Sequence, residues 1–181
     1  MIRVLGIDPG ASAAFALVEA EERGRPRLLW HANVWGTGEA WWNRLNGAVA
    51  ELPAPLDLVL IEVPGGGSRS RRGTRGPATW GGHGAYRGQI VAVLRMHPQS
   101  LQPETIGSDE WPKLLGVRVG KDRGTILAGE HRLREAALYV EAMPPAEGWD
   151  SAADAERAVA VAEAALIACA GVVRLRAGGT Q

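Results

Sequence analysis

The sequence predicts one α/β domain with a mixed five-stranded sheet, in which an antiparallel meander of three strands is followed by two parallel strands and helices flank the sheet. Apolar runs of strand length occupy 2–8, 12–19 and 27–34, and only short turns separate them, as is typical of antiparallel neighbours. The run at 56–63 is almost continuously apolar, which is typical of a buried parallel strand. A chain of 181 residues suits one such domain.

The helices are predicted from apolar periodicity and from the residues that end it. Residues 38–52 place apolar side chains on one helical face and stop before Pro53. The Gly- and Arg-rich stretch 65–84 is expected to be a flexible loop, and helical periodicity resumes at 85–97. The other predicted elements are a strand at 101–106, a helix at 124–142, a last helix from 151 to about 170 with capping-box spacing, and a short disordered C-terminal tail.

The composition indicates a soluble intracellular protein. The single cysteine, Cys169, excludes an internal disulfide framework and a cysteine-based zinc site. No apolar run reaches the roughly 18–20 residues that a membrane span needs. The first residues lack the separate basic and apolar regions of a signal peptide. We therefore expect no membrane association.

Charge is unevenly distributed although the formal net charge is zero. Residues 63–123 carry 10 basic and 4 acidic side chains, whereas 1–62 and 124–181 each carry 5 basic and 8 acidic ones. A phosphate-binding surface beside a carboxylate site would produce this pattern. Chance partition of a neutral chain would produce it as well.

Acidic residues end or interrupt the most apolar segments. Asp8 closes the first strand and Glu62 the fourth, so the two carboxylates lie side by side if these strands are neighbours. A divalent cation would relieve their repulsion, and oxygen-only ligands favour Mg²⁺ or Mn²⁺. Glu163 interrupts the apolar last helix, and Glu156 shares its face two turns earlier. Taken singly, each acid is also compatible with an ordinary solvated position.

Four parts of the chain, in order, carry a family resemblance. They are Gly6-Ile7-Asp8-Pro9-Gly10; Leu60-Ile61-Glu62; Tyr86-Arg87-Gly88 with Trp111-Pro112-Lys113-Leu114-Leu115-Gly116 and Lys121; and Ala162-Glu163-Ala164-Ala165-Leu166-Ile167-Ala168. This ordered set resembles the RuvC-like Holliday junction resolvases of the RNase H-like superfamily, especially the phage-type members. The resemblance spans residues 2 to about 171. The first motif alone is also similar to strand ends of sugar kinases and actin-like ATPases.

The resemblance implies an RNase H-like fold and an endodeoxyribonuclease that resolves four-way DNA junctions. It implies two Mg²⁺ ions, replaceable by Mn²⁺, that activate a water and stabilise the leaving oxygen of an in-line displacement. The products would carry a 5′-phosphate and a 3′-hydroxyl, and no nucleotide cofactor is expected. The implied assembly is a homodimer centred on the helix at 85–97, in the cytoplasm of a bacterial cell or a phage-infected host.

The resemblance also suggests residue roles. Asp8 would bridge both ions, and Glu62 and Glu163 would each hold one. Lys121 is expected to assist catalysis or to position the phosphate, with Lys113 as a secondary phosphate contact. Chance placement of these two lysines, in a chain whose other basic residues are all Arg, is the alternative.

The last helix departs from the family pattern at one point. The family usually has a further Asp or His about one turn before the helix acid, whereas Val159 and Ala160 stand there in this chain. Glu156, on the same helical face, is expected as the fourth metal ligand, with Asp154 as second choice because it already caps the helix.

The segment 65–84 is expected to clamp DNA. Clustered arginines bind phosphates, and a nearby aromatic ring can stack on an unpaired base. The alternative is a solvated insertion. The expected DNA contacts are Arg69, Arg71, Arg72, Arg75, Trp80 and Lys113.

Other functions remain open on the sequence alone. Another RNase H-like nuclease, acting on other branched DNA or on RNA-containing substrates, would have the same site. A catalytically inactive junction-binding protein is compatible with the missing helix acid. An actin-like ATPase or sugar kinase needs two such domains and further phosphate loops, for which 181 residues leave no room.

Overall fold

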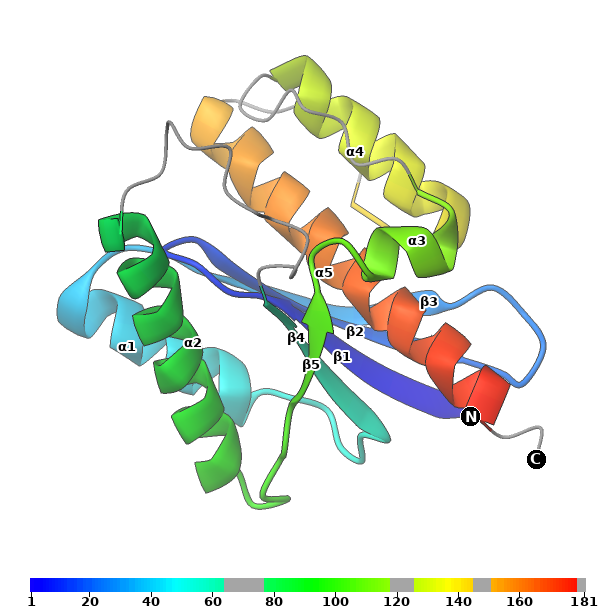
Figure 1. The fold of residues 1–181 in the computed structure, drawn as a ribbon, viewed down its shortest axis with the longest axis horizontal. Coiled ribbons are helices and arrows are strands. Elements are labelled where there is room, and N and C mark those ends of the chain that lie inside the picture. Colours follow the sequence, from blue (N-terminus) through cyan, green and yellow to red (C-terminus); the bar gives the residue numbers. More distant parts are fainter. Residues whose placement is uncertain (64–76, 118–125, 145–150, 179–181) are drawn as a thin grey trace.

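Five strands form one sheet between two layers of helices (Figure 1). The computed structural model describes residues 1–63, 77–117, 126–144 and 151–178, with the backbone alone at 77–83, 126–130 and 152. The strands are β1 (Ile2–Asp8), β2 (Ala13–Ala20), β3 (Arg27–Val34), β4 (Leu58–Val63) and β5 (Glu104–Gly107). The helices are α1 (Gly38–Ala50), α2 (Pro77–Met96), α3 (Trp111–Leu115), α4 (Ile126–Tyr139) and α5 (Ala152–Gly178).

The sheet has the strand order β3-β2-β1-β4-β5. β2 runs antiparallel to both of its neighbours, β1 and β3, because short turns connect these strands. β4 runs parallel to β1, and β5 runs parallel to β4. The predicted mixed sheet, a meander of three strands plus two parallel strands, is therefore confirmed.

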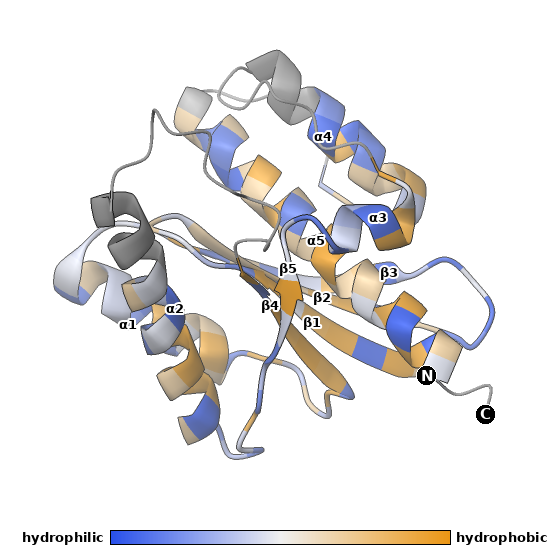
Figure 2. Cartoon of the chain, viewed as in Figure 1, coloured by the Kyte–Doolittle hydropathy of each residue, from blue (hydrophilic) through white to orange (hydrophobic). Residues whose placement is uncertain are grey.

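Side chains alternate between the two faces of the sheet, and each face has its own core. Leu5 and Ile7 of β1 belong to a cluster with Trp41 and Leu45 of α1. Val4, on the opposite face, belongs to a cluster built largely from small side chains of α5. α1 and α2 thus cover one face, and α5, flanked by α3 and α4, covers the other. Figure 2 shows the hydrophobic strands enclosed between these layers.

Two glycines let the backbone of α5 approach the sheet closely. A Cβ on Gly6 would collide with the carbonyl oxygen of Ala164 and lie 2.5 Å from the amide nitrogen of Ala168. A Cβ on Gly171 would lie 2.6 Å from Val4 Cγ1. Since Gly6 meets the middle of α5 and Val4 meets a later part of it, α5 runs antiparallel to β1.

The last turns of α5 continue beyond the predicted end at about 170 and reach Gly178. Arg176 donates hydrogen bonds to the carbonyl oxygens of Glu21 and Gly24 in the β2–β3 turn, and Arg174 pairs with Glu110. Among the described residues, α5 is the one helix long and apolar enough to cross a membrane, but 78% of that stretch is buried inside the protein. Such burial is typical of a core helix.

Other boundaries also differ from the sequence-based expectation. α2 begins at Pro77, inside the expected loop 65–84, and proline suits the first position of a helix. The rest of that loop lies outside the described residues, as do residues 179–181; the start of the expected C-terminal tail, up to Gly178, is part of α5. The five-residue helix α3 was not predicted, because it is too short to show a periodic pattern.

Candidate active site

Strand register places Asp8 beside Glu62. β1 and β4 pair with Gly6 opposite Leu60 and Ile7 opposite Ile61, so Asp8 and Glu62 are the next pair along. Both are half-buried. Because side chains alternate along a strand, Asp8 lies on the same face as Gly6, which is the face covered by α5. Two carboxylates therefore end neighbouring parallel strands on one face of the sheet.

Trp111 fixes the orientation of Glu62. The indole Nε1–H of Trp111 donates a hydrogen bond of 3.0 Å to Glu62 Oε1, and the Trp111 ring is buried in the core beneath α5. The turn before α3 is itself anchored, since Glu110 accepts a hydrogen bond from the Gly107 amide and pairs with Arg174 of α5. These contacts, the backbone bond first and Arg174 second, hold the pKa of Glu110 below its usual range.

Glu163 is the buried acid of α5, with only 7% of its surface exposed. It precedes Ala164, whose carbonyl oxygen lies against Gly6, so Glu163 is carried to the end of β1 at which Asp8 stands. A glutamate at this depth needs a counter-charge or hydrogen bonds, because burial of an unpaired carboxylate is costly.

A buried arginine of α4 supplies that counter-charge. Arg132 is also 7% exposed. Its Nε lies 3.6 Å from Glu163 Oε1, and its Nη1 lies 2.5 Å from Glu135 Oε2. No role for Arg132 or Trp111 follows from the sequence. The contacts of Arg132 with Glu163 and of Trp111 with Glu62 leave no local signal in the sequence, because each joins segments far apart in the chain.

The two candidates for a fourth metal ligand lie further up α5. Glu156 is exposed, whereas Ala160 is buried one turn before Glu163. Asp154 takes part in the helix cap: Ser151 Oγ accepts a hydrogen bond from the Asp154 amide, and the Asp154 carboxylate accepts a 2.6 Å hydrogen bond from the Ser151 hydroxyl. Asp154 also pairs with Arg157, and these contacts, Ser151 first, lower its pKa. The structure thus gives Asp154 a capping role and leaves the fourth ligand a prediction.

The donor chemistry of the Asp8–Glu62 pair fits a hard divalent cation. Both residues offer only carboxylate oxygens, and Mg²⁺ is commonly held by one or two carboxylates with waters and substrate phosphates completing its shell. Within the described part of the chain, no group of three or more His, Cys, Asp or Glu side chains is close enough together to hold one ion. The assignment of Asp8 and Glu62 as metal ligands therefore stays a prediction.

Most of the expected DNA contacts lie outside the described residues. This applies to Lys121 and to the arginines at 69, 71, 72 and 75. The backbone of Trp80 belongs to α2. Lys113 is exposed and donates a 3.0 Å hydrogen bond to Asp109, and this contact lowers the pKa of Asp109.

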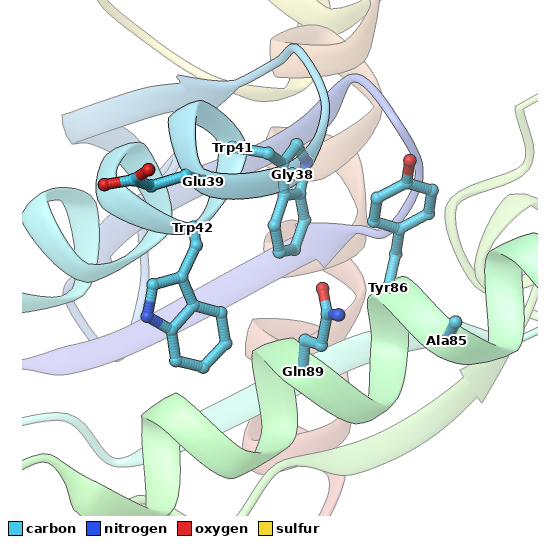
Figure 3. Close-up of a pocket in the computed structure, with 7 residues that line it drawn as sticks. All are labelled: Gly38, Glu39, Trp41, Trp42, Ala85, Tyr86 and Gln89. Carbon is cyan, nitrogen blue, oxygen red and sulfur yellow. The ribbon is translucent and has the colours of Figure 1, made fainter.

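A hollow of about 530 Å³ lies on the other face of the sheet, between α1 and α2 (Figure 3). Its lining includes the aromatic residues Trp41, Trp42 and Tyr86, and the ring centroids of Trp41 and Tyr86 are 4.9 Å apart. Since Asp8 and Glu62 face α5, this hollow is separate from the candidate active site.

The strand order and the helix across β1 define an α/β fold of the RNase H-like class. Within that class, the chain is similar to T. thermophilus RuvC in complex with a Holliday junction substrate, with a TM-score of 0.66 and 17% identity over 98% of this chain and 97% of that one. A second Thermus thermophilus RuvC structure matches over the same shares, with a TM-score of 0.63 and 17% identity. No family model matches the sequence, and no curated protein sequence matches it significantly. The predicted resemblance is thus confirmed for the fold.

Proposed function

We propose that this protein is a divalent-metal-dependent endonuclease that cleaves four-way DNA junctions. The observation that carries the proposal is the β1–β4 register, which sets Asp8 beside Glu62 on the face where α5 brings in Glu163. The likeness of the fold to a RuvC bound to a Holliday junction substrate supports this choice of DNA. In this role the protein acts on DNA in the cytoplasm of a bacterial cell or a phage-infected host.

The proposed reaction is hydrolysis of a phosphodiester to give a 5′-phosphate and a 3′-hydroxyl. Asp8 and Glu62 would hold Mg²⁺ or Mn²⁺, which when bound supplies positive charge for the phosphate oxygens and lowers the pKa of a coordinated water. The hydrogen bond from Trp111 fixes the orientation of one Glu62 carboxylate oxygen. The ion pair with Arg132 holds Glu163 in place at the edge of the sheet where Asp8 and Glu62 lie. Lys121 is proposed to position the phosphate.

DNA binding is assigned to the basic middle of the chain. We propose that the arginines at 69, 71, 72 and 75, with Lys113, contact phosphates, and that Trp80 stacks on an unpaired base. β4 ends at Val63, one residue after Glu62, and the arginines at 69, 71, 72 and 75 follow it in the sequence before α2 begins at Pro77.

We further propose a homodimer centred on α2. The exposed face of its described part carries small residues four apart, namely Gly84, Gly88 and Ala92. A Cβ built on Gly84 or Gly88 meets no atom within 4 Å in the described part of the chain. Intramolecular packing therefore does not require glycine at these positions, whereas close approach of a second helix would.

The test is cleavage of a synthetic four-way DNA junction in Mg²⁺ by wild type, Glu62→Gln and Glu163→Gln. We expect paired, symmetric nicks from wild type, intact linear duplex, and loss of cleavage in both variants. Glu22→Gln is the matched control, because Glu22 is an exposed acid in the β2–β3 turn, at the opposite edge of the sheet. It should cleave as wild type does.

Two other outcomes would replace the proposal. Equal attack on linear duplex, on other branched DNA or on an RNA–DNA hybrid would identify a different RNase H-like nuclease. Junction binding without nicks in either Mg²⁺ or Mn²⁺ would identify an inactive junction-binding protein. Val159 and Ala160, which stand where the family resemblance implies an Asp or His, are the observation that favours this second candidate.

A further inference from the structure

The positive charge beside Glu163 comes from a side chain of the protein, the guanidinium of Arg132. Arg132 is almost fully buried and lies between two carboxylates, Glu163 at 3.6 Å and Glu135 at 2.5 Å. Arginine is rarely buried unless it is paired, and removing one partner of a buried pair is strongly destabilising. The guanidinium is therefore a fixed feature of the α4–α5 contact.

This cation changes the charge balance around Glu163. Arginine cannot lose its proton in a protein, so the positive charge next to Glu163 is permanent. A metal ion bound to Glu163 would stand close to that charge, and like charges repel strongly where water is scarce. Asp8 and Glu62 form a pair of carboxylates on adjacent strands, and such a pair favours a divalent cation.

The neighbouring positions on α5 add no ligand for a second ion. One turn before Glu163 stands the buried Ala160, and Val159 beside it is apolar. Glu156 is exposed at the next turn, and Asp154 is engaged by Ser151 and Arg157. Among the described residues, the ends of β1 and β4 thus provide oxygen ligands, whereas the guanidinium of Arg132 places a positive charge beside Glu163 of α5.

We infer that Arg132 takes the place of a second metal ion, so that each chain binds a single divalent cation at Asp8 and Glu62. Glu163 is then a positioning residue, held by Arg132 at the edge of the site. This inference rests on the proposed function, and it replaces the two ions that the family resemblance implies with one ion and one arginine.

The test counts the Mn²⁺ ions bound by the full chain without DNA, by electron paramagnetic resonance of free Mn²⁺ and by calorimetry. We expect one ion per chain for wild type and loss of that ion in Glu62→Gln. Arg132→Gln should bind two ions, because this change removes the permanent positive charge beside Glu163. Arg134→Gln is the matched control, since Arg134 is exposed on the same helix, and it should bind one ion.

The wild-type count decides the question even if Arg132→Gln does not fold. Arg132→Lys retains the positive charge and should still bind one ion, with unchanged circular dichroism. Two ions of similar affinity in wild type, together with junction cleavage, would overturn this inference and leave the proposed nuclease intact. No bound ion and no cleavage would overturn both.

Discussion

The hydrogen bond from Trp111 to Glu62 shows how a single residue can prepare the site. A carboxylate at the end of a strand can rotate, but the buried indole holds one of the two Glu62 oxygens at 3.0 Å. Groups that orient metal ligands in this way commonly change metal affinity or activity by about 10–100-fold when they are replaced. Trp111 is thus expected to act on catalysis through Glu62.

Replacement Trp111→Phe should therefore lower the rate of junction cleavage by about 10–100-fold while the protein stays folded. Phenylalanine retains an aromatic ring in the core but cannot donate the hydrogen bond. The measurement is the single-turnover cleavage rate at several Mg²⁺ concentrations, with circular dichroism to verify folding. Trp42→Phe, an exposed tryptophan of α1 on the other face, should leave the rate unchanged. An unaltered cleavage rate in Trp111→Phe would show that the hydrogen bond from Trp111 to Glu62 does not contribute to catalysis.

At this scale the sequence predicts acids better than their partners. Asp8, Glu62 and Glu163 are conspicuous because each carboxylate ends or interrupts an apolar segment, and such charges are costly without a reason. Arg132 and Trp111 become informative only when α4 and α3 are packed against α5. Their contacts depend on the tertiary arrangement, which no local pattern reports.

The element that organises the site is α5. It crosses the sheet at Gly6, where the strand must lack a side chain to let the helix backbone come close. Gly6 belongs to the same motif as Asp8, so one short segment provides both a candidate ligand and the contact that sets the depth of Glu163. The glycine of this motif therefore has a packing role.

Replacement Gly6→Ala should lower the free energy of unfolding by about 1–3 kcal/mol or more, since overpacking of a well-filled core typically has this effect. The added methyl group meets the backbone of α5, which cannot rotate away as a side chain would. Urea unfolding followed by circular dichroism measures the change. Gly47→Ala is the control, because in the described part of the chain no atom outside the adjacent residues and backbone of α1 lies within 4 Å of its Cβ position. Equal stability of Gly6→Ala and wild type would contradict the close approach.

The exposed face of α2 carries the second prediction about an element. If this face forms the dimer, Gly88→Arg should convert the dimer into monomers, because a long charged side chain prevents two helices from meeting. Analytical ultracentrifugation over a range of concentrations measures the effect. Gly47→Arg places the same side chain on the exposed surface of α1 and should keep the wild-type assembly. A monomeric wild type would refute the dimer itself.

The order and type of the major elements could be predicted from the sequence, because their apolar patterns are long. The boundaries of the elements were harder to predict where tertiary contacts determine them. α5 continues to Gly178 because Arg174 and Arg176 find partners on β5–α3 and on the β2–β3 turn. α3 exists because Trp111 is buried beneath α5, although five residues are too few for a helical pattern.

At the scale of the whole molecule, the core on the α5 face encloses the one cysteine of the chain. Cys169 is 3% exposed, and burial raises the pKa of its thiol to about 12. The thiolate is the reactive form, so very little of it exists in the folded protein near pH 8. The reactivity of Cys169 should therefore report on the separation of α5 from the sheet.

We expect thiol-modifying reagents at pH 8 to label Cys169 rapidly in denaturant and very slowly in the native protein. Across a urea series the extent of labelling should follow the unfolding curve measured by circular dichroism. Rapid labelling under native conditions would show that α5 opens without global unfolding.

The free energy of unfolding should also depend on pH. Since the folded state favours the protonated thiol of Cys169, this free energy should decline as the pH rises from 9 toward 12, and Cys169→Ala should reduce that decline.

The antiparallel course of α5 along β1 also determines where the two ends of the chain lie. Ile2 begins β1 and Gly178 ends α5 at the same edge of the sheet, near the β2–β3 turn that Arg176 contacts (Figure 1). Asp8 and Glu62 stand at the other edge, a full strand length away. A fluorophore or a surface tether attached near Ile2 or Gly178 would thus lie far from Asp8 and Glu62, which suits the protein to immobilisation for single-molecule observation.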